Sequence, residues 1–424
     1  MADIDELVFT LALVLLLGVT SYLISRKAKL SYIFVFIILG LLFGPVLNVV
    51  NTDLARKLFD YVRVFGLVII LFTEGHNLKW YILKKHLPTI GTLDTLGLII
   101  TAVLAGLFFS YVFHLPFIAG FLYGAIISAT DPATLIPLFH QYKVRDDLRI
   151  ILESESIFND PLGIVLTSLA VAFVVPQAPS AQFIEYFAQY MPLSLAALSY
   201  FLYEVIISII LGVGVAIIGY LLIRHLKFER NEEIILFALG LAFIGFYIGE
   251  KLMASGYLVA TTLGIILGNH HEFFRETAED ELKIRSTIDT ELHFNEVLSM
   301  FAAVFIFLLL GMSIRLDILI TTFLPSLLVA LGVVLLARPI ACLPIIPIGK
   351  WSFKEYLFIS LEGPRGVVPS VLASLPLSLG IMYNNPTLIS WGEVILSTTL
   401  VTIIVSIILE TSWLPFLRRK LLGE

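Results

Sequence analysis

The sequence ESESIFNDP at residues 153–161 brings Glu155, Asn159 and Asp160 into one short stretch. Runs of Ile, Leu, Val and Phe flank it, and a second polar stretch, SATDPAT at residues 128–134, lies in similar surroundings. A charged side chain at the centre of a bilayer costs roughly 2.5–3.5 kcal/mol on insertion scales, so it is paired, neutralised or hydrated. These two stretches therefore indicate a functional site inside a membrane protein.

The composition supports this class of protein. Hydrophobic residues make up 58% of the chain, charged residues only 14%, and the mean hydropathy is +0.97, which excludes an ordinary water-soluble domain. The first apolar run follows the acidic sequence MADIDE and has no small-residue cleavage site after it, so we interpret it as a span and not as a signal peptide. The single cysteine, Cys342, excludes an intrachain disulfide.

Apolar runs long enough to cross a bilayer predict an all-α polytopic protein with about thirteen transmembrane helices. The ninth run is short, so twelve or fourteen spans remain open. The thirteen candidates lie near residues 7–25, 30–47, 58–76, 87–113, 116–139, 148–175, 196–224, 232–250, 255–268, 294–314, 318–348, 354–376 and 389–414.

Lys and Arg predict the orientation of these spans. With the N-terminus outside and the C-terminus in the cytoplasm, most of the basic residues fall into cytoplasmic loops, as the positive-inside rule requires. The expected location is the cell membrane. The chain has no GxxxxGKS/T loop, so we expect an ion or substrate gradient, and not a nucleotide, to supply the energy.

Two proline-bearing interruptions predict inverted repeats with discontinuous helices that cross near the midplane. SATDPAT interrupts the fifth span and LEGPRGVVP the twelfth, and an odd number of spans separates them, so the two helices run in opposite directions. We therefore expect a first six-helix repeat over residues 1–195, a connecting span over 196–230 and an inverted second repeat over 231–424. The alternative is a pair of unrelated proline kinks.

The prolines free backbone groups that need compensation inside a membrane. Pro132 and Pro364 each remove a backbone donor. Asp131 is suited to the positive N-terminal end of one half-helix and Arg365 to the negative C-terminal end of another. Alternatively, Arg365 pairs with Glu362.

Asp160 is the predicted ion-binding carboxylate. It lies about 12 residues, or roughly 18 Å, from the cytoplasmic end of its span, close to mid-membrane. Ser156 lies one helical turn before it on the same face. Other buried oxygen donors, which we expect to converge on this face, are Glu74, Thr130 and Asp131. A set of oxygen ligands without His or Cys suits a hard cation and not zinc or copper.

One deep arginine, Arg338 in LLARPI, needs an acidic partner, and we assign Glu155 to it as a buried structural ion pair.

These motifs identify a family. A chain with TDP in the fifth span, ESxxND in the sixth and GPRG in the twelfth resembles the NhaP branch of the sodium/proton antiporters, relatives of the animal sodium/proton exchangers. The resemblance implies a homodimer with a six-helix transport bundle and a separate dimerisation bundle. It implies that Asp160 exchanges Na⁺ and H⁺, and that Asn159 marks the branch with electroneutral one-for-one exchange. It also places the ion among Asp160, Ser156, Glu74, Thr130 and Asp131, and a bridge between Glu155 and Arg338.

The predicted function is secondary active antiport by alternating access, in which sodium and protons compete for Asp160. The chain is then a transporter and not an enzyme, with protons and either sodium or lithium as its partners. We expect no cofactor, nucleotide or nucleic acid. Potassium/proton antiport is the main alternative because oxygen ligands do not fix the ion radius, and a cation channel is a weaker one. A membrane protease is disfavoured because GxGD, HExxH and GxSxG motifs are absent.

Overall fold

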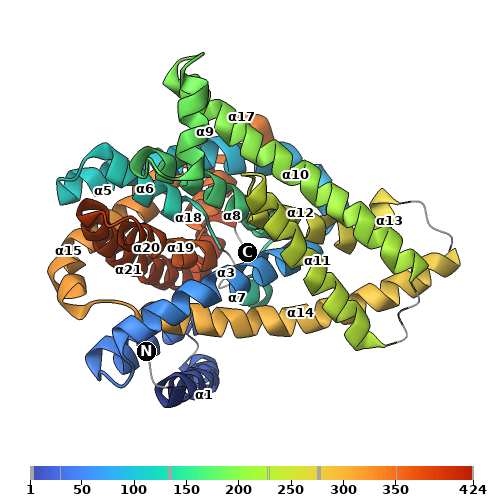
Figure 1. Cartoon of the computed structure of the whole chain (residues 1–424), viewed down its shortest axis with the longest axis horizontal. Helices are drawn as coiled ribbons and strands as arrows, with labels where there is room; N and C mark the ends of the chain where they lie inside the picture. The colour runs from blue at the N-terminus through green and yellow to red at the C-terminus, as the bar shows by residue number, and fades with distance from the viewer. Residues whose placement is uncertain are drawn as a thin grey trace. The chain divides into compact units, whose positions relative to one another are not determined.

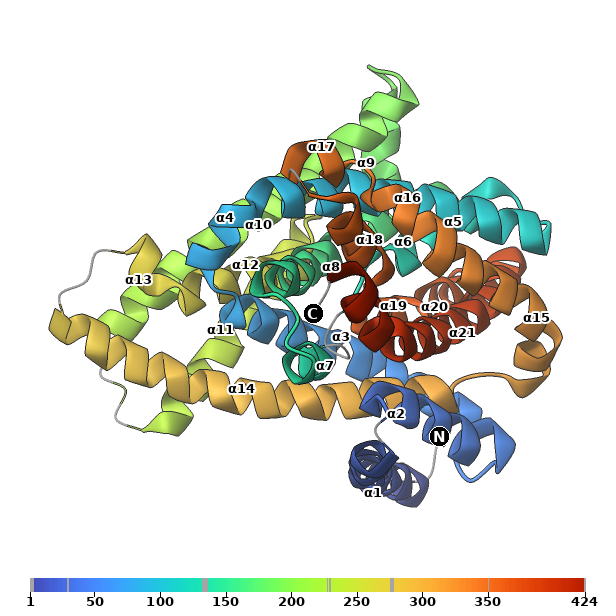
Figure 2. The ribbon, with the colours of Figure 1, turned by 180° about the vertical axis from the view of Figure 1, so that it is seen from behind.

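Every regular element in the described part of the chain is a helix (Figures 1 and 2). The computed structural model describes residues 4–28, 30–131, 136–226, 228, 230–274, 278–349 and 351–422. Pro132, which was expected to interrupt the fifth span, lies outside these residues. The prediction of an all-helical, multi-pass membrane protein is confirmed.

The α-helices follow one another with short connections. In chain order they are α1 (Ile4–Ala28), α2 (Tyr32–Leu41), α3 (Thr52–Asn77), α4 (Trp80–Thr92), α5 (Leu98–Phe113), α6 (Phe117–Ser128), α7 (Ile136–Gln141), α8 (Asp146–Val174), α9 (Pro179–Ala188), α10 (Leu193–His225), α11 (Asn231–Lys251), α12 (Gly256–Gly268), α13 (His270–Phe273), α14 (Ala278–Met312), α15 (Leu316–Gly332), α16 (Arg338–Cys342), α17 (Ile345–Gly349), α18 (Phe353–Leu361), α19 (Val367–Leu372), α20 (Leu375–Met382) and α21 (Pro386–Leu417).

Short π-helical segments join or extend several of these helices. They are η1 (Leu42–Val46), η2 (Leu93–Gly97), η4 (Val333–Ala337) and η5 (Arg418–Leu422). Because η2 and η4 continue directly into α5 and α16, the chain stays helical from Leu83 to Phe113 and from Leu316 to Cys342.

Eight described helices are long and apolar enough to cross a membrane. They are Ile4–Ala28, Leu83–Phe113, Asp146–Val174, Leu193–His225, Glu232–Lys251, Leu292–Met312, Leu316–Cys342 and Pro386–Leu421. Four shorter apolar helices accompany them: Tyr32–Val46, Phe117–Ser128, Gly256–Gly268 and Val367–Met382. Two of these short helices come from the fifth and twelfth predicted spans, which the structure divides.

Local sequence explains where the divided helices begin and end. A capping box starts α18: the Ser352 hydroxyl accepts from the Glu355 N–H (3.3 Å), and the Glu355 carboxylate accepts from the Ser352 N–H (2.8 Å). The helix stops at Leu361, before the sequence EGPRG. Proline disfavours the helical conformation of the residue before it and donates no backbone hydrogen bond, so the helix resumes only at Val367.

The chain separates into two compact units. The first unit comprises Met1–Val64, Pro88–Asn159 and Ala303–Glu424, and the second comprises Phe65–Leu87 and Asp160–Ala302. In the first unit, α21 packs against α15, α20, α19 and α6, and α5 packs against α6 (Figure 2).

The second unit has its own apolar core. Helices α10, α11 and α12 pack against one another (Figure 1). The end of α3 in this unit adds Phe72 to the core, which Tyr220 of α10 and Leu263 of α12 also form.

Helices α5 and α6 approach each other closely enough to require glycine. A Cβ atom on Gly124 would collide with the carbonyl oxygen of Ala102 and lie 2.8 Å from the backbone nitrogen of Gly106. Backbone atoms cannot move away as a flexible side chain can. The contact therefore fixes the distance between the two helices.

We predict that Gly124→Ala destabilises the detergent-solubilised protein by about 1–3 kcal/mol, the usual range for overpacking a tight interior. Gly91→Ala is the matched control, because a Cβ atom there meets no atom within 4 Å. Thermal unfolding followed by circular dichroism compares the two. Equal melting temperatures for both variants would contradict the proposed close contact.

Candidate ion-binding site

Two interrupted helices of the first unit meet at their breaks. The first break follows α6, where Ala129 is extended (φ −66°, ψ 145°), and the second separates α18 from α19. The N–H of Asp131 donates to the carbonyl oxygen of Pro364 over 2.7 Å. The SATDPAT and LEGPRGVVP segments are therefore in direct backbone contact.

Each break supplies a charged side chain to the helix end of the other. The Asp131 carboxylate accepts from the N–H of Val367 in the first turn of α19, over 3.2 Å. The Arg365 guanidinium donates to the carbonyl oxygens of Ser128 and Ala129 at the end of α6, each over 3.0 Å. An acid thus faces a positive helix end and a base a negative one. Because both side chains are almost fully buried, water does not screen these contacts.

Glycine is required beside Asp131. A Cβ atom on Gly366 would collide with the Asp131 carboxylate. The GPRG sequence therefore supplies the arginine that binds one helix end and the small residue that admits the acid at the other.

Helix α8 presents a hydroxyl and an amide to the first break. Asn159 donates from Nδ2 to the Thr130 hydroxyl (2.7 Å) and accepts at Oδ1 from the Thr130 N–H (3.2 Å). Ser156 donates its hydroxyl to the Thr130 carbonyl oxygen (2.8 Å). Thr130 is thus held through its N–H, its carbonyl and its side chain. We call Thr130, Ser156 and Asn159 the threonine clamp.

The threonine clamp gives Asn159 a role that its sequence position did not reveal. Both polar atoms of its amide contact Thr130, so it holds the broken helix against α8. An ionised aspartate would add a second charge there and could not donate to the Thr130 hydroxyl.

Asp160 follows the threonine clamp directly on α8 and is only 2% exposed. Ser156 lies one helical turn before it. Pro161 does not end the helix, which continues to Val174. Glu74 is half-buried near the end of α3. Asp160 and Glu74 both belong to the second unit, and their arrangement around an ion remains a prediction.

A buried ion pair joins α8, the helix of Ser156 and Asn159, to α16. Arg338 donates from both terminal nitrogens to the two carboxylate oxygens of Glu155, over 2.5 and 2.8 Å, and the side chains are 6% and 1% exposed. Arg338 is the first residue of α16, directly after η4. Among the described residues no ion pair joins Arg365 to Glu362, because Arg365 contacts the end of α6 instead.

Two further site residues, from α21, were missed in the sequence. The N–H of Gly363 donates to the Glu410 carboxylate (2.6 Å), and the N–H of Arg365 donates to the Ser406 hydroxyl (3.0 Å). The available signal was Glu410 itself, an acid inside the apolar run IILETSWL.

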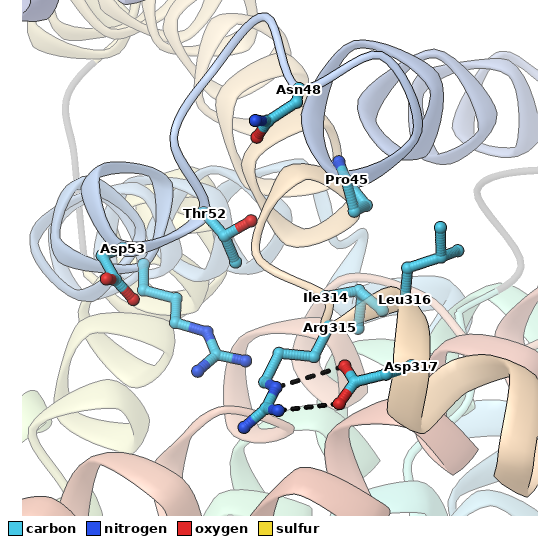
Figure 3. A pocket seen from close by; sticks show the side chains of 9 residues that line it. Pro45, Asn48, Thr52, Asp53, Ile314, Arg315, Leu316 and Asp317 are labelled. Atoms are coloured by element: carbon cyan, nitrogen blue, oxygen red, sulfur yellow. Dashed lines mark hydrogen bonds and ion pairs between the residues drawn. The ribbon is translucent and has the colours of Figure 1, made fainter.

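A pocket of about 400 Å³ lies elsewhere in the first unit, where α3 and α15 begin (Figure 3). Arg315 contacts Asp317 there through two bonds of 3.3 and 2.7 Å, and Arg56 binds Glu393 through two bonds of 2.9 Å. Because arginines accompany its acids, this pocket lacks the excess of carboxylates that a cation site needs.

The fold and the paired helix breaks define a class, the multi-pass helical membrane transporters with discontinuous helices. The profile of the family described as "Sodium/hydrogen exchanger, transmembrane" matches residues 11–420, and the chain belongs to this family.

Known antiporters are similar to this chain over almost its whole length. Na(+)/H(+) antiporter 1 of Methanocaldococcus jannaschii is 37% identical over 98% of this chain and 95% of that protein. A solved structure of the sodium proton antiporter MjNhaP1 from the same organism, at pH 8, has a TM-score of 0.85 and 33% identity, and the match covers 97% of this chain and 100% of the other. A more distant relative, K(+)/H(+) antiporter NhaP of Alkalimonas amylolytica, is 28% identical over 90% of this chain and 62% of that protein.

We predict that Glu155→Gln destabilises the protein by about 3–5 kcal/mol, because it leaves the Arg338 guanidinium buried without its anionic partner. The loss is measured as a lower melting temperature in detergent. The double variant E155Q/R338Q removes both charges and should regain part of the stability. A double variant no more stable than E155Q would argue against a pairwise interaction.

Proposed function

We propose that this chain is a secondary antiporter that exchanges sodium ions for protons across the cell membrane, one for one. Membership of the sodium/hydrogen exchanger family supports the proposal, as does the 37% identity with a protein named as a Na(+)/H(+) antiporter. The observation that carries it is the buried carboxylate of Asp160, next to the threonine clamp on a helix that contacts a broken one.

Competition for Asp160 couples the two fluxes. A buried carboxylate is stable when it holds either a proton or a sodium ion, and the bare anion is costly to move through an apolar barrier. The empty carrier therefore stays in place, and each passage carries one ion or the other. Glu74, Ser156, Thr130 and Asp131 supply the remaining oxygens around sodium.

Asn159 keeps the exchange electroneutral. Beside Asp160 it contributes hydrogen bonds but no charge. One carboxylate that carries one proton outward in exchange for one sodium ion, or the reverse, moves no net charge.

Alternating access requires that the helices around Asp160 move as a body. We place thirteen spans in the membrane, with the N-terminus outside and the C-terminus in the cytoplasm. Residues 1–195 and 231–424 form two inverted repeats, and residues 196–230 connect them. A six-helix transport bundle then moves against a dimerisation bundle in a homodimer, and the contacts between the two breaks keep the site intact during the movement.

We predict that Asp160→Asn reduces sodium-driven proton flux in proteoliposomes to the level of protein-free vesicles, because the amide can neither release a proton nor bind sodium as an anion. A pH-sensitive dye inside the vesicles reports the flux after a sodium pulse. Glu185→Gln, an exposed acid on α9, should retain the normal rate. Normal flux through D160N would refute the assignment of Asp160.

The same vesicles test the transported ion and the stoichiometry. Potassium at equal concentration should drive little proton movement, and a larger flux with potassium than with sodium would assign potassium/proton antiport instead. The rate of one-for-one exchange should not change when an imposed membrane potential is varied.

A further inference from the structure

Side chains on one face of α21 bind backbone N–H groups of the second helix break. Ser406 and Glu410, one helical turn apart, accept from the N–H groups of Arg365 and Gly363. The indole N–H of Trp413 donates to the carbonyl oxygen of Leu361, the last residue of α18, over 3.2 Å. The Glu410 carboxylate of α21 is therefore one of the groups that stabilise the break between α18 and α19.

A second acid, Glu362, lies in the same break. It is fully buried, and neither of its carboxyl oxygens has a hydrogen-bond partner among the described residues. Glu410 is only 2% exposed, and its carboxylate binds the residue next to Glu362 in the chain. Glu362 directly precedes Gly363, whose N–H donates to the Glu410 carboxylate over 2.6 Å, so the two acids belong to the same backbone contact.

The positive charges near this pair already have other partners. Arg338 of α16 is bound through both terminal nitrogens by Glu155 of α8. Arg365 in the break donates to two carbonyl oxygens at the end of α6. Two uncharged groups of the described chain also lie near the break: the Trp413 indole and the Tyr123 hydroxyl of α6, which is bonded to Thr402 over 2.8 Å.

Two ionised carboxylates at this place would leave one negative charge without any bound donor. Burial of an isolated carboxylate is far more costly than burial of a neutral acid, and two nearby carboxylates disfavour each other's ionisation. One proton removes both problems. It gives Glu362 a donor of its own and leaves Glu410 able to accept from Gly363.

We propose that Glu362 and Glu410 together bind one proton, and that they form a second proton-binding site separate from Asp160. The two acids behave as one titrating unit, so the proton belongs to the pair and not to either residue alone. Neither acid was assigned to ion exchange by the function proposed above, and the site stands whether or not Asp160 carries sodium.

The position of the pair gives the proton a structural effect. Its loss places a second negative charge beside the Gly363–Glu410 contact. The same break contains Arg365 and Pro364, which hold the end of α6 and the N–H of Asp131. Protonation of the pair is thus linked to the geometry of both broken helices.

Infrared spectroscopy of the full-length protein tests the site, because a protonated carboxyl group has a C=O stretching band that a carboxylate lacks. Difference spectra are recorded for the wild type against E362Q and E410Q, each in the D160N background, so that Asp160 makes no contribution. We expect E362Q to remove one buried carboxylic acid band per chain, because Glu410 keeps its bond from the Gly363 N–H as a carboxylate. E410Q should keep a band at a shifted frequency, because Glu362 has no bound donor and then holds the proton without a neighbouring carboxylate.

Glu185→Gln is the control and should remove no such band. E362Q replaces a side chain that has no hydrogen bond among the described residues, so it should fold even if E410Q does not. A carboxylic acid band unchanged in E362Q, or no such band in D160N, would overturn the proposal. Failure of the proposed function instead appears as normal sodium-driven flux through D160N, so the two results are independent.

Discussion

The structure depends on the need to satisfy the backbone of two interrupted helices away from water. Hydrocarbon offers no hydrogen-bond partners, so irregular backbone within a membrane is tolerated only where protein or a hydrated cavity supplies them. In this chain each break supplies partners to the other. Asp131 binds the start of α19, Arg365 binds the end of α6, and a backbone bond from Asp131 to Pro364 joins the two segments.

The last helix provides the second support. Four polar residues recur on α21 at intervals of one turn, and all are buried. Thr398 bonds to Ser326 (2.9 Å), Thr402 to Tyr123 (2.8 Å), and Ser406 and Glu410 to the break after α18. An apolar 18-residue stretch of this helix is accordingly 72% buried, the highest share among the eight long apolar helices of the described chain. A polar stripe on a membrane helix here marks a face that binds other protein segments.

The buried acids of this chain differ in the groups that they bind. Glu155 is neutralised by an arginine and is structural, whereas Asp131 is held by a helix end. Glu362 and Glu410 form a third category, an acid pair without a dedicated cation.

The sequence by itself determined the class of protein, the approximate helices and the location of the two breaks. These features are local: hydropathy over about 20 residues decides whether a segment can cross a bilayer, and proline and glycine interrupt a helix wherever they occur. The same local reasoning singled out Asp160, because a charge in an apolar run is conspicuous. It could not give an exact count of spans, since the ninth apolar run, which forms α12, is too short to be recognised by length.

Only the tertiary structure decided which groups meet. Gly363 and Glu410 are 47 residues apart, and Arg338 and Glu155 are 183 apart. Such contacts depend on how whole helices pack, and no local pattern encodes that packing. The role of Asn159 was hidden for the same reason, because an amide in an acidic motif does not reveal that it binds the backbone N–H and the hydroxyl of a threonine in the break after α6. The sequence thus placed the charges, and the packing of α6, α8, α18, α19 and α21 selected their partners.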